Sequence, residues 1–507
     1  MKNLVVCFDG TWNVPEQEEN GVASPTNVVK LFHSLADKAE DGCEQLKYYH
    51  PGVGTEHSAF KKQMGGMFGY GIAMHIKSAY FWLGCNYEPN DRIYLFGFSR
   101  GAFTVQSLSA LINLRGIPPL KGVKSADAWK KVESEYKKYQ KRKSDSTRSG
   151  EGNIHFLGLW DMVGALGIPN SSAVLNLFDS GDAWKYHDGK LQANVRHARH
   201  AMAMDERRAS FTVARWNNCE ESRRNGQDVG ELWFSGVHSD VGGGYYESGL
   251  SDCALEWMMR EAEKCSLGIR PEAKEFIKPE PCAVMHNSLK GIFKKLRSRP
   301  RNIPAMTPEN GTLFHASALE RQKKSPILFP AYHPTKILQP GENLTVEIFA
   351  DKRWNDTGIY LEAGVEYTFS AEGEWVDSHD VCDWKGTDDG KPTLGDITKS
   401  AASFLGGFEN LFHTITGNDD SDFMLTKRIE AFPWFIMVGA IANDSGNSDS
   451  VANDGSPVTH QYVKLPEFET QPLVLDSAGY LYCFPNDVWS LYGNNHGSIM
   501  LTVKRER

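Results

Sequence analysis

Short apolar runs alternate with stretches of helical periodicity through the first half of the 507-residue chain. Continuous apolar runs predict buried strands over residues 4–8, 46–49, 93–98, 154–160 and 232–237. Apolar positions at helical spacing predict helices over residues 28–35 and 72–83 and from Ala102 onward. This alternation predicts an α/β fold with a mostly parallel sheet.

From about residue 334 the pattern changes to short apolar runs joined by turn-rich links. Strands are predicted over residues 344–349, 360–361, 365–370, 434–441, 473–475, 480–484 and 498–503. Such spacing is typical of an all-β sandwich. We therefore expect an α/β domain over residues 1–333, with a charged helical insertion at 121–152, and a β-sandwich domain over residues 334–507.

The predicted strand 93–98 runs into a helix through Gly97-Phe98-Ser99-Arg100-Gly101. This G-x-S-x-G pattern in a strand–turn–helix context is what a nucleophile elbow needs, because the sharp turn lifts the serine hydroxyl out of the sheet. A tight turn with an incidental serine is the alternative.

Two further chemical groups follow predicted strands in chain order. Asp161 comes directly after the strand 154–160, and His238 comes directly after the strand 232–237. A serine hydroxyl needs a histidine to remove its proton, and the imidazole needs a carboxylate to fix its tautomer. The order Ser99, Asp161, His238 is that of the α/β-hydrolase triad.

Composition narrows the function classes. Hydrophobic residues make up 40% and charged residues 23%, which is typical of globular domains. The net charge of −9 argues against a nucleic-acid binder, and nine cysteines without a CxxC pair give no zinc signal. The N-terminal apolar run is too short for a signal peptide, so we expect synthesis in the cytoplasm and any export by a route without a cleaved signal.

Three segments could contact a membrane or could be ordinary surface or packing elements of the fold. Residues 289–301 combine six Lys or Arg with four apolar residues, which fits a solvated helix end or a lipid-contacting patch. Residues 400–416 place phenylalanines on one helical face, for packing onto the domain or for a lid. The insertion 121–152 is expected as an exposed helix, with a cap or membrane element as the alternative.

Several motifs resemble one family in the right order. They are FDGTWN at 8–13, GFSRGA at 97–102, LGLWDMVGA at 157–165, AMDERRASF at 203–211 and GVHSDVGGGY at 236–245. Together they resemble the catalytic domain of type VI secretion phospholipase effectors of the first Tle class, over roughly residues 1–330. The resemblance implies an α/β-hydrolase fold and phospholipase A activity on bacterial membrane lipids. It also implies that Ser99 is the nucleophile, Asp161 the orienting carboxylate and His238 the base, with Asp240 as the reserve carboxylate.

An oxyanion hole of backbone amides is expected beside the nucleophile. One donor is Arg100, and the other comes from Gly10 or Thr11 in the early loop. Asp9 is expected to shape that loop by accepting backbone N–H bonds. A structural ion-pair role is expected for three charged residues of the 203–211 motif, Asp205, Arg207 and Arg208.

A weaker resemblance covers the C-terminal domain. Residues 486–497 are similar to the calcium loop of small calcium-dependent galactose-binding bacterial lectins. The resemblance implies calcium held by the side chains of Asp487, Asn494 and Asn495, the Leu491 carbonyl and a carbonyl from the loop near Asp377. Oxygen ligands are what this hard cation prefers. Trp489 and Leu491 depart from the lectin pattern, and an Asn-rich turn in a β-sandwich is the alternative.

These observations favour a serine esterase of the phospholipase A1 or A2 type, acting as a secreted antibacterial effector and targeted by a lectin-like domain. No cofactor is expected for catalysis. The expected partners are membrane phospholipid with peripheral membrane contact, a glycan, a secretion-apparatus component and an immunity protein, but no nucleic acid. Two alternatives stay open: an intracellular esterase for a soluble substrate, and a carbohydrate-binding or interaction protein whose hydrolase domain is inert.

Overall fold

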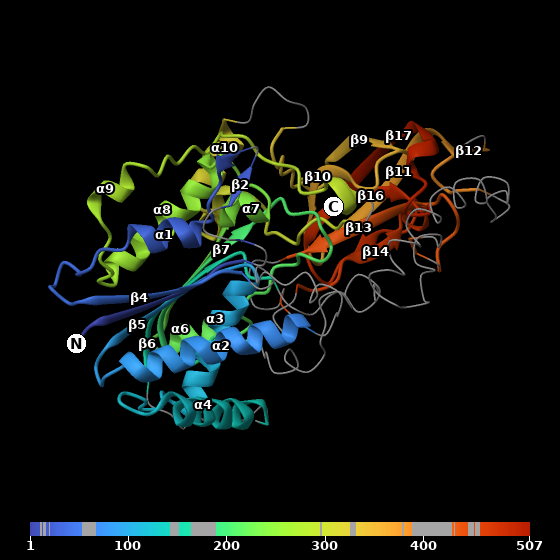
Figure 1. The fold of residues 1–507 in the computed structure, drawn as a ribbon. Helices are drawn as coiled ribbons and strands as arrows, with labels where there is room; N and C mark the ends of the chain where they lie inside the picture. Colours follow the sequence, from blue (N-terminus) through green and yellow to red (C-terminus); the bar gives the residue numbers. More distant parts are fainter. Residues whose placement is uncertain are drawn as a thin grey trace.

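A computed structural model shows a parallel sheet wrapped by helices beside a body of antiparallel strands (Figure 1). The structure describes residues 1–506 except 11–12, 14–16, 20, 53–66, 142–151, 164–188, 295–296, 325–330, 378–379, 388–427, 430, 445–450 and 452–456. The expected segment 400–416 therefore lies outside the described residues.

The α/β part is built on a six-stranded sheet in the order β4-β1-β5-β6-β7-β8, with every neighbouring pair parallel. The strands are β1 (Asn3–Phe8), β4 (Gln45–His50), β5 (Arg92–Phe98), β6 (Ile154–Trp160), β7 (Val195–Ala203) and β8 (Asp228–Phe234). The fold class and the predicted strands are confirmed, but β8 begins earlier and ends at Phe234, and β7 was not predicted. The sequence of β7, VRHARHAMA, carries arginine and histidine where the other central strands are apolar.

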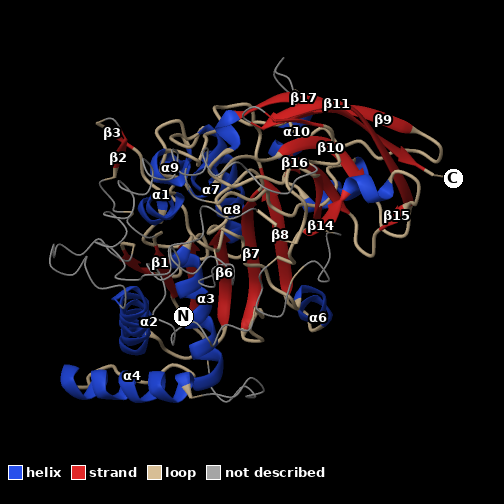
Figure 2. Cartoon of the chain, turned by 90° about the vertical axis from the view of Figure 1, so that its right-hand side faces the viewer, coloured by secondary structure: helices blue, strands red, loops and turns tan. Residues whose placement is uncertain are grey.

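Helices cover both faces of this sheet (Figure 1, Figure 2). One face carries α1 (Asn27–Ser34) and α8 (Gly249–Lys264), and the other carries α2 (Met67–Asn86), α3 (Arg100–Arg115) and α4 (Ser125–Gln140). The remaining helical turns are α6 (Cys219–Arg224), α7 (His238–Gly242), α9 (Pro271–Lys274), η2 (Gly291–Lys294), η3 (Pro308–Leu313) and α10 (Ala316–Lys323), and a short hairpin joins β2 (Glu18–Glu19) to β3 (Val22–Ala23).

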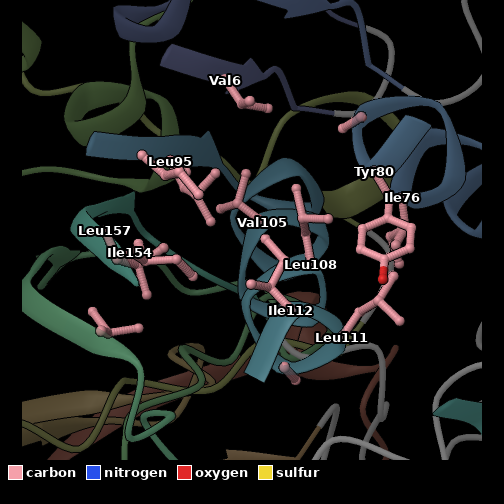
Figure 3. Close-up of a cluster of buried hydrophobic side chains, with 14 of the residues drawn as sticks. Val6, Ile76, Tyr80, Leu95, Val105, Leu108, Leu111, Ile112, Ile154 and Leu157 are labelled. Atoms are coloured by element: carbon pink, nitrogen blue, oxygen red, sulfur yellow. The ribbon is translucent and has the colours of Figure 1, made fainter. Parts of the chain in front are cut away.

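Helix α3 is buried along its length, and its apolar side chains pack between the sheet and α2 (Figure 3). Val105 and Leu108 lie in one cluster with Val6, Leu95 and Leu157 from the strands. This packing fixes the start of α3 at the end of β5. Within the charged insertion, Ser125–Gln140 forms α4, which buries an apolar stripe of Ala128, Val132, Tyr136 and Tyr139 in the same cluster, as a surface helix does. Residues 142–151 of the insertion lie outside the described residues.

The C-terminal part is a sandwich of two antiparallel sheets around a core that contains Trp375 and Phe435. One sheet has the order β10-β16-β13-β14, from β10 (Asn355–Leu361), β16 (Gly479–Pro485), β13 (Met437–Asn443) and β14 (Gln461–Lys464). The other has the order β12-β11-β17-β9, from β12 (Asp380–Cys382), β11 (Glu366–Asp377), β17 (Asn495–Arg505) and β9 (Asn343–Phe349), with β15 (Leu473–Val474) paired to β11. The turns η6 (Leu465–Phe468) and η7 (Tyr492–Asn494) complete it. The predicted all-β architecture is confirmed, and the boundary near residue 334 stays a prediction.

The two parts share a buried apolar cluster. Trp233 and Phe314 from the α/β part lie in it with Val438, Tyr480 and Phe484 from the sandwich. Polar contacts cross the same boundary: Asn302 Nδ2 donates to the Asn443 carbonyl at 2.7 Å, and the Met306 amide donates to the Tyr480 hydroxyl at 2.9 Å. Within the described residues, no helix combines the length and apolarity needed to cross a membrane.

Candidate active site

Ser99 lies on a strained turn between β5 and α3. Its φ of 58° and ψ of −125° are unfavourable for a residue with a side chain and are held by the surrounding packing. A Cβ at Gly97 would lie 2.5 Å from the Gly101 carbonyl oxygen, and a Cβ at Gly101 would lie 2.3 Å from the Phe8 carbonyl oxygen. Both glycines are therefore required by close backbone approach, as the G-x-S-x-G pattern predicts.

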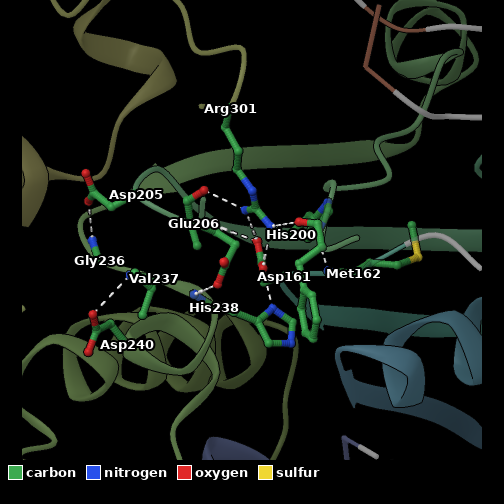
Figure 4. Close-up of polar contacts among 12 residues, drawn as sticks. Asp161, Met162, His200, Asp205, Glu206, Gly236, Val237, His238, Asp240 and Arg301 are labelled. Carbon is green, nitrogen blue, oxygen red and sulfur yellow. Dashed lines mark hydrogen bonds and ion pairs between the residues drawn. The ribbon is translucent and has the colours of Figure 1, made fainter. Parts of the chain in front are cut away.

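Asp161 and His238 meet at the same edge of the sheet (Figure 4). Asp161 follows β6 with a φ of 38°, and its Oδ2 lies 2.5 Å from His238 Nδ1 at the start of α7. Both side chains are buried. Because the carboxylate holds Nδ1, Nε2 is the ring nitrogen left for proton transfer. The rings of Phe98 and Phe211 pack on the imidazole, at centroid distances of 4.6 and 5.0 Å.

Arg301 is a second partner of Asp161 that the sequence did not predict. Its Nη1 lies 2.6 Å from Oδ1 and its Nη2 lies 2.9 Å from Oδ2, on the side of the carboxylate opposite His238 (Figure 4). The Ala203 amide also donates to Oδ1 at 2.8 Å. Burial alone would raise the pKa of Asp161, but the Arg301 guanidinium and His238 hold it well below its usual range.

The basic segment 289–301 is thus not uniformly lipid-facing. Gly291–Lys294 forms only the short turn η2, and Arg301 is buried against Asp161. No local pattern distinguishes Arg301 from its basic neighbours, because its role depends on a residue 140 positions earlier.

Replacing Arg301 with methionine is expected to lower the free energy of unfolding by about 3–5 kcal/mol, because it leaves a buried carboxylate without its strongest cation. Urea unfolding of both proteins measures the difference. Arg224→Met is the control, since that exposed i,i+4 pair with Glu220 contributes at most about 1 kcal/mol. Equal stabilities of the Arg301 and Arg224 variants would contradict the assignment.

Asp240, the reserve carboxylate, does not contact the His238 ring. Its Oδ1 lies 2.6 Å from His286 Nδ1, and its Oδ2 accepts the Val237 and His286 amides at 3.0 Å each. It therefore caps α7 and joins it to the segment at His286. The reserve assignment is wrong, because the helix directs this carboxylate away from the imidazole.

The 203–211 motif forms structural contacts, as expected for Asp205 and Arg208. Asp205 binds His333, Tyr332 and the Gly236 amide, at 2.8, 2.9 and 2.6 Å. Arg208 pairs with Glu206 at 2.8 Å, and Glu206 also accepts the His238 amide at 3.3 Å. The motif thus positions the backbone that carries His238.

The structure agrees with only part of the expected oxyanion hole. Arg100 is the first residue of α3, so its amide lies at a helix N-terminus. The Gly10 amide instead donates to Asp9 Oδ1 at 2.7 Å, which confirms the loop-shaping role of Asp9 and contradicts Gly10 as a donor in this conformation. Thr11 lies outside the described residues. Burial raises the pKa of Asp9 to about 6, although hydrogen bonds from Thr26, Gly10 and Tyr49 act to lower it.

The candidate calcium loop contains buried oxygen atoms without partners. Asp487 Oδ2 accepts Asn495 Nδ2 at 2.9 Å, while the side-chain oxygens of Asn494 and Asn495 are buried and have no hydrogen bond. Asp377 pairs with Asn495 in the β11–β17 register, and the Leu491 carbonyl accepts the Asn494 amide at 3.1 Å. Burial, together with the negative charge of Asp377, raises the pKa of Asp487 to about 7. These oxygens fit a hard cation that would satisfy them.

Comparison with known proteins assigns a family to the α/β part. Residues 2–261, about half of the chain, match the family described as the catalytic domain of Tle1-like phospholipase effectors of type VI secretion systems. An uncharacterized protein of Saccharomyces cerevisiae is 33% identical over 242 residues, which are 41% of this chain and 32% of that protein. The chain thus matches about a third of the length of this curated relative.

Solved structures resemble parts of the chain. An uncharacterized protein from Pseudomonas aeruginosa matches with a TM-score of 0.34 and 19% identity, over 55% of this chain and 49% of that one. The esterase Est2 from Thermogutta terrifontis matches with a TM-score of 0.28 and 13% identity, over 52% and 83%. The N-terminal domain of EclA, a PllA-like lectin, matches with a TM-score of 0.14 and 17% identity, over 32% and 95%.

Proposed function

The chain belongs to the Tle1-like phospholipase effector family of type VI secretion systems through its catalytic domain, and on this premise we propose that it is a serine esterase acting on membrane glycerophospholipids. The observation that carries the proposal is a serine on a strained strand–helix turn at the same sheet edge as a buried Asp161–His238 pair. Family membership supports the lipid substrate, and the site geometry supports the serine mechanism.

In the proposed reaction, Ser99 Oγ attacks the acyl carbonyl carbon while His238 Nε2 takes the hydroxyl proton. The Arg100 amide stabilises the oxyanion of the tetrahedral intermediate, with Thr11 as the second proposed donor. Collapse expels the lysolipid alcohol, which receives the proton from His238. Water, deprotonated by the same imidazole, then attacks the acyl-enzyme, releasing fatty acid and restoring Ser99. Asp161 holds the correct tautomer and stabilises the imidazolium.

Activity is expected to persist below the pH at which an exposed histidine becomes protonated. Burial lowers the pKa of His238 from the ordinary 6.5, and Asp161 only partly offsets this shift. Since the base must be neutral, the acid limb of kcat/KM should have its midpoint below pH 6.5. A pH profile with a short-chain ester measures it, with circular dichroism at each pH as the folding control. A midpoint above 6.5 would contradict the assignment.

The wider role follows from the family. We propose secretion by a non-Sec route into a bacterial target cell, cleavage of the sn-1 or sn-2 ester at the membrane surface, and protection of the producer by an immunity protein. An intracellular esterase for soluble substrates is the competing function. It predicts cleavage of a short-chain ester without release of fatty acid from vesicles.

We also propose that the sandwich binds calcium and, through it, a glycan that holds the enzyme at its target surface. The buried, unpartnered oxygens of Asn494 and Asn495 beside Asp487 support this second function. A bound ion would join Asp487, Asn494, Asn495, the Leu491 carbonyl and Asp377, and would present its remaining coordination positions to sugar hydroxyls.

Calcium is expected to stabilise the chain. At 100 times its Kd it adds about 2.7 kcal/mol, raising Tm measurably. The effect should weaken as pH falls through about 7, because protonation of Asp487 competes with the ion. Differential scanning calorimetry with calcium or magnesium tests this, with Asp487→Asn as the matched variant. An equal calcium shift in Asp487→Asn, or none in wild type, would contradict the site.

The experiment for the main proposal uses mixed phospholipid vesicles with wild type and Ser99→Ala. Release of free fatty acid and lysolipid by wild type alone is the predicted result. Ser99-dependent cleavage of a short-chain ester without release from vesicles would reject the membrane substrate and keep the hydrolase. Full toxicity of the Ser99→Ala variant would instead favour an interaction protein with an inert hydrolase domain.

A further inference from the structure

A recess lies where the α/β part meets the sandwich, beside the candidate active site. Its lining is basic and apolar and includes no acidic residue: Arg208, Phe211, Thr212, Val213, Arg299, Pro300, Arg301, Asn302 and Pro457. A ligand in this recess therefore meets positive charge.

The recess adjoins the catalytic pair directly. Phe211, in its wall, packs its ring edge to face against the His238 imidazole at 5.0 Å. The Arg208 guanidinium lies 3.5 Å from the centre of the Phe211 ring, and Arg301, another lining residue, holds Asp161. A group bound here would lie one aromatic ring away from the base that serves Ser99.

The three arginines of the recess differ in how their charges are compensated. Arg208 pairs with Glu206 and Arg301 pairs with Asp161. Arg299 pairs with no carboxylate of the described chain; its Nη2 donates to Asn302 Oδ1 at 3.2 Å and to the Val458 carbonyl at 2.7 Å. The largely buried charge of Arg299 thus has only neutral partners, an arrangement that favours binding of an anion.

Resting on the proposed phospholipase function, we propose that Arg299 binds the phosphodiester anion of the glycerophospholipid, with Arg208 beside it, while the acyl ester reaches Ser99. Because Nη2 of Arg299 already donates to Asn302 and Val458, its Nε–H and Nη1–H groups are the charged donors left for the phosphate oxygens. Val213 and Pro300 offer apolar surface to the glycerol carbons. Because Pro457 and Val458 belong to the sandwich, this domain shapes the substrate site as well as any surface attachment.

The test measures binding by calorimetry in the Ser99→Ala background, so that no ligand is hydrolysed. The probes are dibutyryl phosphatidylglycerol, dibutyrylglycerol and inorganic phosphate. The phospholipid should bind about 10- to 100-fold more tightly than the diacylglycerol, and Arg299→Gln should remove most of this preference. Arg299→Lys should restore part of it, and Arg224→Gln, an exposed arginine, should leave it unchanged.

If Arg299→Gln weakens the binding of both lipids equally, Arg299 has a structural role and the proposal is overturned. Equal affinity of the Ser99→Ala protein for both lipids would also overturn it. Phosphate that binds through Arg299 without displacing the phospholipid would assign the recess to a free anion and also overturn it. Fatty-acid release by wild type tests the proposed function separately. An Arg299-dependent preference without such release would reject that function and keep the recess as a phosphodiester site.

Discussion

Ser99→Ala is expected to lower kcat for a short-chain ester by about 10⁶-fold, to the level left by binding and oxyanion stabilisation. The turn that holds Ser99 costs strain, and it places the serine at the same sheet edge as the Asp161–His238 pair. Alanine removes only the hydroxyl, so folding should be unaffected. Steady-state kinetics with purified protein measures the change.

Ser107→Ala is the matched control, because it removes a buried hydroxyl from α3, the helix that follows Ser99. We expect its kcat to stay within about 10-fold of wild type. A Ser99→Ala enzyme that keeps more than a hundredth of wild-type kcat would show that another group attacks the ester.

Asp161→Asn is expected to lower kcat by about 10⁴-fold while KM changes little. An amide no longer stabilises the imidazolium and favours the wrong tautomer of His238. It also leaves Arg301 without its anion, so the variant should be less stable. Urea titration shows the conditions in which the variant is folded. Kinetics measured under those conditions separate the catalytic loss from the loss of stability.

Asp240→Asn distinguishes the two carboxylates. Asp240 caps α7 and binds His286, so its substitution should cost stability and lower kcat by no more than about 10-fold. A larger kcat loss in Asp240→Asn than in Asp161→Asn would return the catalytic role to Asp240.

The sequence predicted those parts of the fold that local pattern determines. Apolar runs identified β1, β5 and β6, and the glycines of G-x-S-x-G identified the elbow, because each signal lies within a few residues. Strand β7 was missed because its arginines and histidines, including the buried Arg199 and His200, break the apolar run.

The rest of the site depends on contacts between distant segments. Arg301 and Asp161 are separated by 140 positions, and no motif links them. The choice between Asp161 and Asp240 likewise depends on the direction in which α7 points its side chains. The Gly10 amide cannot be assigned to the oxyanion hole from sequence, because it donates to the side chain of its neighbour Asp9. The recess at Arg299 requires residues from both domains, which only the assembled fold brings together.

Covalent labelling with a fluorophosphonate tests the central claim, an activated Ser99, most directly. The probe forms a bond to a serine whose proton an adjacent histidine removes, and peptide mass spectrometry identifies the modified residue. The proposed site predicts one adduct on Ser99 in wild type, strongly reduced in His238→Ala and absent in Ser99→Ala. An unlabelled Ser99 in folded wild-type protein, or an adduct on a different serine, would contradict it.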